Sequence, residues 1–135
     1  GTLYILVFAL IVRFYAIPYG GVTSGYSRVP SNLFDASESL GYSRMATSIK
    51  ITFPLIRTSV IATAILTFVD IVKELPMTLI LRPFNFETLA TYTYQFAHDE
   101  LMIQASLPAF FIILTGLIPI LLLQKQLSNF FYSKN

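Results

Sequence analysis

The chain has no cysteine and only one histidine in its 135 residues. The absence of cysteine excludes disulfide bonds, thiol catalysis and cysteine-based metal sites, and one histidine leaves little material for a histidine-based proton relay. The sequence also lacks the phosphate-binding pattern G-x-x-x-x-G-K-[ST], the zinc pattern H-E-x-x-H and the nucleophile pattern G-x-S-x-G. We therefore expect no enzyme activity, no catalytic residues, and no metal ion or cofactor held by this chain.

Charged residues are also scarce, at 12% of the chain against about 25% in an average soluble domain, while hydrophobic residues make up 55%. This composition predicts an integral membrane protein in contact with the lipid bilayer. The length allows one compact domain. Net charge is only +2, and the basic residues are scattered among apolar segments, so we expect no nucleic-acid partner.

Three apolar segments are long enough to cross the bilayer as helices, which takes about 20 mostly apolar residues. They cover approximately residues 3–19, 55–72 and 107–123. Arg13 interrupts the first segment; an intramembrane arginine is a candidate functional residue, but we favour a side chain that snorkels to the cytoplasmic end. The prediction is an all-α membrane protein with about three transmembrane helices.

The distribution of lysine and arginine predicts the orientation. Basic residues retain a loop on the cytoplasmic side of the membrane. Six lie in or directly after the first loop or in the C-terminal tail, namely Arg28, Arg44, Lys50, Arg57, Lys125 and Lys134. The loop after the second span has only Lys73 and Arg82. We therefore expect residues 20–54 and the C-terminus in the cytoplasm, and residues 74–106 on the outer side of the membrane.

The polar loop at residues 30–54 is predicted to form a hairpin of two short helices. Asn32 is suited to cap the first helix, with Asp35 in its first turn, where a negative charge favours the helix dipole. Gly41 can end that helix in a left-handed conformation, Ser43 can cap the second helix, and Pro54 closes or kinks it. Apolar residues at helical spacing give each helix a stripe: Leu33, Ala36 and Leu40 in the first, Met45, Ile49 and Phe53 in the second.

These residues resemble the EAA loop of inner-membrane permeases of binding-protein-dependent ABC importers. That loop has the form E-A-A-x-x-x-G, nine residues, I-x-L-P. Seven residues of this chain occupy its defined positions with both spacings kept: Asp35, Ala36, Ser37, Gly41, Ile51, Phe53 and Pro54. Four of them, Ala36, Gly41, Ile51 and Pro54, are identical to the motif. The departures are aspartate for glutamate, serine for the second alanine, and phenylalanine for leucine.

Residues 73–76 (KELP) and 81–90 (LRPFNFETLA) resemble the C-terminal half of ferric-iron permeases. This likeness implies a multi-pass protein of the bacterial inner membrane, with the chain as the C-terminal part of a longer, MetI-like permease domain. Ferric iron is the implied substrate. Thiamine, polyamine and anion permeases share the architecture and remain alternatives.

The resemblance also implies partners. The hairpin would couple the permease to a cytoplasmic ABC ATPase subunit, which binds ATP and Mg²⁺. A periplasmic substrate-binding protein would contact residues 74–106, and a second permease half, identical or fused, would complete the pathway. The alternatives are a hairpin that only packs on its own spans as a cap, and a scaffold subunit without transport activity.

Acidic and tyrosine residues gather between Asp70 and Glu100, and hard oxygen ligands suit a trivalent cation. Interfacial location accounts for most of them, and no metal-ligand spacing is present. Asp70 and Glu74, one helical turn apart, are the best candidates for lining a cation path, although Lys73 could neutralise them.

Overall fold

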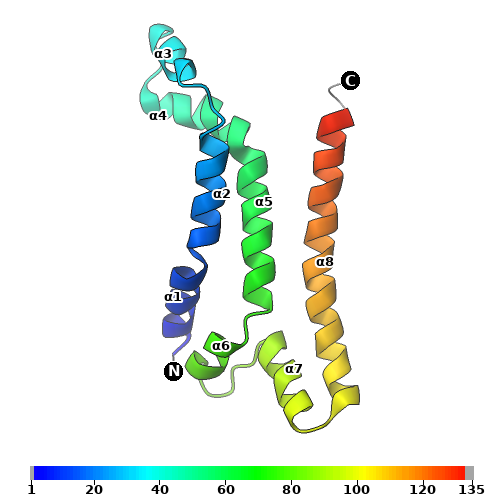
Figure 1. Ribbon diagram of the computed structural model, residues 1–135. Coiled ribbons are helices and arrows are strands. Elements are labelled where there is room, and N and C mark those ends of the chain that lie inside the picture. Colours follow the sequence, from blue (N-terminus) through cyan, green and yellow to red (C-terminus); the bar gives the residue numbers. More distant parts are fainter. Residues whose placement is uncertain (1, 133–135) are drawn as a thin grey trace. The chain divides into compact units, whose positions relative to one another are not determined.

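The computed structural model describes residues 2–132, and all regular structure in that range is helical (Figure 1). In chain order the elements are α1 (Leu3–Phe14), α2 (Ala16–Tyr26), α3 (Asn32–Ser39), α4 (Arg44–Thr47), a π-helix (Ser48–Thr52), α5 (Phe53–Val72), α6 (Pro76–Leu81), α7 (Leu89–His98) and α8 (Met102–Tyr132). The expected all-α class is confirmed.

Two continuous helical stretches are long and apolar enough to cross a membrane. They are Arg44–Val72, which joins α4, the π-helix and α5, and Met102–Asn129 within α8. The pair α1 and α2 qualifies only when both are taken as one broken span. Two or three spans therefore agree with the expected number, and the first predicted segment is interrupted at Tyr15.

The surface of these helices is apolar. Among the described residues only four hydrophobic side chains are buried: Leu6, Ile56, Ala90 and Ala105. Large apolar side chains are instead exposed along both long helices, for example Ile113 at 65% and Leu55 at 58%. Monomeric soluble proteins rarely leave apolar surface of this extent in water, and together with the two or three helices that could cross a membrane this suggests a membrane protein.

The chain divides into two compact units. One consists of Gly1–Tyr15 and Ile65–Asn135, and the other of Ala16–Ala64. In the first unit, α6 packs on α1, and α7 packs along α8 as a helical hairpin (Figure 1). The second unit contains α2, the hairpin of residues 30–54, and the first half of α5.

Glycines bring α2 close to α5 in the second unit. A Cβ atom at Gly21 would overlap the side chain of Thr63, and one at Gly25 would lie 2.8 Å from the Cβ of Ser59. These four residues form a G-x-x-x-G pattern on α2 opposite S-x-x-x-T on α5, a common way for small residues to let membrane helices approach. This pattern was not among the sequence-based predictions, although its spacing is visible in the sequence.

Candidate functional site

The first helix of the hairpin begins one residue earlier than expected. Asn32 is its first helical residue, and Ser31 occupies the N-cap without a side-chain cap bond. Ser31 already has helical dihedrals (φ −61°, ψ −34°), because a turn in which the Leu33 N–H donates to the Pro30 carbonyl leads into the helix. The prediction of Asn32 as the N-cap was therefore wrong, while Asp35 does lie in the first turn.

The first helix ends at Gly41 as expected. Gly41 has a left-handed conformation with φ +83°. Its N–H donates to the Glu38 carbonyl (3.0 Å), and the Tyr42 N–H donates to the Ser37 carbonyl (3.1 Å). This pair of bonds is a Schellman motif, which satisfies the last carbonyls of the helix and fixes the direction of the chain beyond it.

The second helix starts at a cap and ends in a π-helix. The Ser43 side chain accepts a hydrogen bond from the Ala46 N–H (3.3 Å), as predicted. The π-helix at Ser48–Thr52 lies just before Pro54. Proline has no N–H, and its ring crowds the carbonyl four residues before it, so a local widening of the helix accommodates it. The expected kink therefore takes the form of a π-turn.

One buried contact joins the two helices of the hairpin. The Ser37 and Thr47 hydroxyl oxygens lie 2.7 Å apart, and the two residues are 3% and 0% exposed. Each hydroxyl also lies within hydrogen-bond distance of a backbone carbonyl, that of Phe34 for Ser37 and that of Ser43 for Thr47. Because each hydroxyl has one proton, one of them donates to the other, and the second donates to its carbonyl. The third position of the seven-residue match thus faces inward, where only a small side chain fits.

The other matched positions lie mainly on the surface. Asp35, Ala36, Gly41, Phe53 and Pro54 are exposed, and Ile51 is half-buried. Beside them lies an open groove of about 260 Å³, to which Asp35, Glu38, Tyr42 and Arg44 contribute. The groove therefore combines two carboxylates from α3 with one guanidinium from α4.

Arg13 does not snorkel freely, which corrects our expectation. Its Nε lies 3.3 Å from Oε2 of Glu74, whose side chain is only 7% exposed. Oε1 of the same carboxylate accepts a hydrogen bond from the Met77 N–H (3.1 Å) in the first turn of α6. A buried carboxylate attracts the nearest cation, so Glu74 connects the end of α1 to the start of α6.

Asp70 and Glu74, which we expected to line a cation path, are each paired with a basic side chain. Asp70 Oδ1 lies 2.8 Å from the Lys73 Nζ, and Glu74 pairs with Arg13. The two ion pairs leave no net charge among these four residues. The assignment of a path to them stays a prediction.

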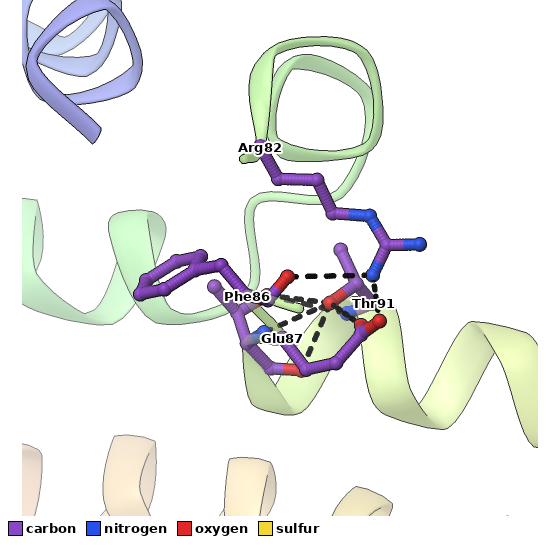
Figure 2. Close-up of polar contacts among 5 residues, drawn as sticks. Arg82, Phe86, Glu87 and Thr91 are labelled. Atoms are coloured by element: carbon purple, nitrogen blue, oxygen red, sulfur yellow. Dashed lines mark hydrogen bonds and ion pairs between the residues drawn. The ribbon is translucent and has the colours of Figure 1, made fainter. Parts of the chain in front are cut away.

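The segment between α6 and α7 forms a loop that is held by polar side-chain contacts (Figure 2). Arg82 pairs with Glu87, and the Thr91 hydroxyl donates to Glu87 Oε2 (2.8 Å). Thr88 and Thr91 form a capping box at the start of α7. Phe84, in the middle of this loop, is fully exposed. The contacts of this loop could not be predicted from the sequence, because no periodic spacing relates Arg82 to Glu87.

No group of three or more histidine, aspartate and glutamate residues within residues 2–132 is placed to hold a metal ion. The single histidine, His98, stacks on Tyr94 with ring centroids 5.9 Å apart. Comparisons of the chain with protein-family models, curated proteins and solved structures find no match. The likeness to ABC permeases therefore depends on the matched residues alone.

Proposed function

We propose that the chain is part of the permease subunit of an ABC importer, and that the hairpin of residues 30–54 transmits movement between an ATPase subunit and the membrane spans. One observation carries the proposal. A small polar hairpin is attached directly to a helix that is long and apolar enough to cross a membrane. The hairpin is closed by the Schellman turn at Gly41 and by the buried Ser37–Thr47 contact. Its residues match the EAA spacing throughout.

Rigidity is the physical requirement for this role. Movement of one subunit reaches another only through elements that keep their own shape, because a flexible loop would absorb the displacement. Both helix ends that face the turn are capped, and the two helices share a buried hydroxyl contact. Asp35 and Glu38 on the groove suit a basic surface of the ATPase.

The other components of the transporter follow from the resemblance. A periplasmic binding protein would deliver the substrate, for which ferric iron is our first candidate. A second permease half would complete the pathway in the bacterial inner membrane, and the ATPase would bind ATP and Mg²⁺. A cation that passed Asp70 and Glu74 would compete with Lys73 and Arg13 for their carboxylates. Thiamine, polyamine or anion transport, and a non-transporting scaffold, are the alternatives.

The test uses substitutions at Gly41. We expect Gly41→Arg to abolish substrate uptake and chain-dependent ATP hydrolysis without affecting membrane insertion, because φ +83° is strained for any residue with a Cβ and the new side chain projects from the turn. The measurements are uptake of radioactive ferric iron by cells, and vanadate-sensitive ATPase activity of the purified complex in lipid nanodiscs.

The matched control is Gly41→Asn, since asparagine tolerates the left-handed region better than other residues. This variant should keep most of the activity. Normal uptake by Gly41→Arg would refute the coupling role. An ATPase partner whose turnover is the same with and without the chain would favour a scaffold.

A further inference from the structure

The two arms of the hairpin carry opposite charge. The helix α3 contains Asp35 and Glu38 and no basic residue. From Ser43 to Val69 the sequence has no acidic residue and three basic ones, Arg44, Lys50 and Arg57. We call residues 43–57 the basic arm. A single surface of uniform charge therefore cannot be complementary to both arms. Each arm needs a binding surface of the opposite charge.

An apolar stripe runs along the basic arm. Met45, Ile49 and Phe53 recur every four residues and are 75%, 62% and 56% exposed. The groove is lined instead by Arg44, Thr47 and Ser48 of the same segment, which are offset in sequence from the residues of the stripe and therefore lie on another face of the helix. A protein bound in the groove would leave the stripe uncovered.

The position of the basic arm indicates what covers the stripe. The helix α5 has 20 residues, hence a length of about 30 Å at 1.5 Å per residue. The hydrocarbon core of a bilayer is also about 30 Å thick, so α5 alone is long enough to cross it. Figure 1 shows that the chain bends at the π-helix so that α4 lies across the end of α5, which places the residues before α5 at the level of the lipid headgroups.

We infer that the basic arm lies in the membrane interface and binds anionic lipid. Met45, Ile49 and Phe53 insert between headgroups and acyl chains, and Lys50 and Arg57, which do not line the groove, bind lipid phosphates. Lys50 already lies over the Tyr42 ring, 5.4 Å from its centroid; this contact uses its charge but leaves its N–H groups for phosphate. The inference depends on the membrane character of α5 and not on the proposed transport function.

Because the chain has no cysteine, single labels can be placed directly. We would attach the environment-sensitive fluorophore NBD to Ile49→Cys and, as a matched control, to Ser48→Cys, which is exposed on the groove side. The labelled chains are reconstituted in vesicles of phosphatidylcholine with or without about one third phosphatidylglycerol. Brominated acyl chains report insertion, and aqueous iodide reports contact with water.

We expect the Ile49 label to be quenched severalfold more strongly by brominated lipid, and less by iodide, than the Ser48 label. This difference should increase with phosphatidylglycerol. Lys50→Gln with Arg57→Gln should remove that increase, whereas Lys125→Gln on α8 should not. Circular dichroism verifies that each variant keeps its helical content.

Equal iodide quenching at the two positions in both kinds of vesicle would overturn the inference. So would protection of Ile49 that rises with the ratio of protein to lipid, which indicates a second copy of the chain, or that requires an added ATPase subunit. These results would leave the Gly41 test of coupling unaffected, so the two proposals can fail separately.

Discussion

Three separate polar contacts meet at Glu74. Its Oε2 pairs with Arg13, its Oε1 accepts the Met77 N–H, and its backbone carbonyl accepts the Thr78 hydroxyl (3.2 Å). Both Glu74 and Thr78 are buried. In a membrane such a carboxylate is costly unless it is paired, so the pair with Arg13 makes the apolar surroundings of α1 and α6 tolerable for both charges.

Substitutions of Arg13 and of Glu74 should therefore lower the free energy of unfolding by different amounts. We expect Arg13→Gln to lower the free energy of unfolding by about 1–2 kcal/mol, because it leaves a buried carboxylate unpaired; the value is reduced from the cost of a fully buried pair since Arg13 is partly exposed. Glu74→Gln, which keeps an acceptor for Met77, should cost less. Thermal unfolding in detergent measures both.

The control for this ion pair is the more exposed pair of Asp70 and Lys73. Lys73→Gln should change stability by less than about 1 kcal/mol. If Arg13→Gln and Lys73→Gln had the same effect, the burial of Glu74 would be irrelevant to its pairing.

Two buried threonines in the hairpin segment offer a second comparison. Thr52 Oγ1 is buried and has no hydrogen-bond partner within the described residues, whereas Thr47 Oγ1 contacts Ser37. We expect Thr52→Val to leave stability unchanged or to raise it slightly, and Thr47→Val to cost about 1 kcal/mol, because only the second substitution removes hydrogen bonds. Denaturant unfolding of the two variants compares them, and an equal loss for both would contradict this account.

At the scale of elements, local signals were predictable and distant ones were not. The turn at Gly41 and the cap at Ser43 were predicted because both act through residues a few positions away. The contact of Arg13 was not, because Glu74 comes from a segment far along the chain and no periodicity links them. Pro54 predicted a distortion of the helix, but the sequence alone does not distinguish a kink from a π-turn.

Helix packing in the second unit provides a prediction at this scale. Gly21→Ala should destabilise the chain by about 1–3 kcal/mol, because the new methyl group overlaps Thr63 and forces α2 away from α5. Gly20→Ala is the matched control: no atom lies within 4 Å of its Cβ position, so it should be neutral. Thermal unfolding in nanodiscs compares the two, and equal melting temperatures would exclude close packing at Gly21.

For the molecule as a whole, composition alone predicted the class. A chain so poor in charge can place its apolar side chains only in a protein core or in lipid, and the helices of this chain are too exposed for the first. The candidate site was predictable as far as its position and turn. Its inward-facing hydroxyls and its groove required coordinates, because they depend on how the two helices face each other.

The π-helix affects the direction in which the groove of the hairpin points relative to the helix that follows it. A π-turn holds one more residue than an α-turn, which rotates everything before it by roughly 100° about the helix axis relative to everything after it. The nine residues between Gly41 and Ile51 include most of this turn. The π-turn therefore acts as an angular setting: an unbroken α-helix with the same number of residues could keep every cap and contact of the hairpin and still point its groove in a different direction, whereas loss of one residue together with the π-turn would leave that direction unchanged.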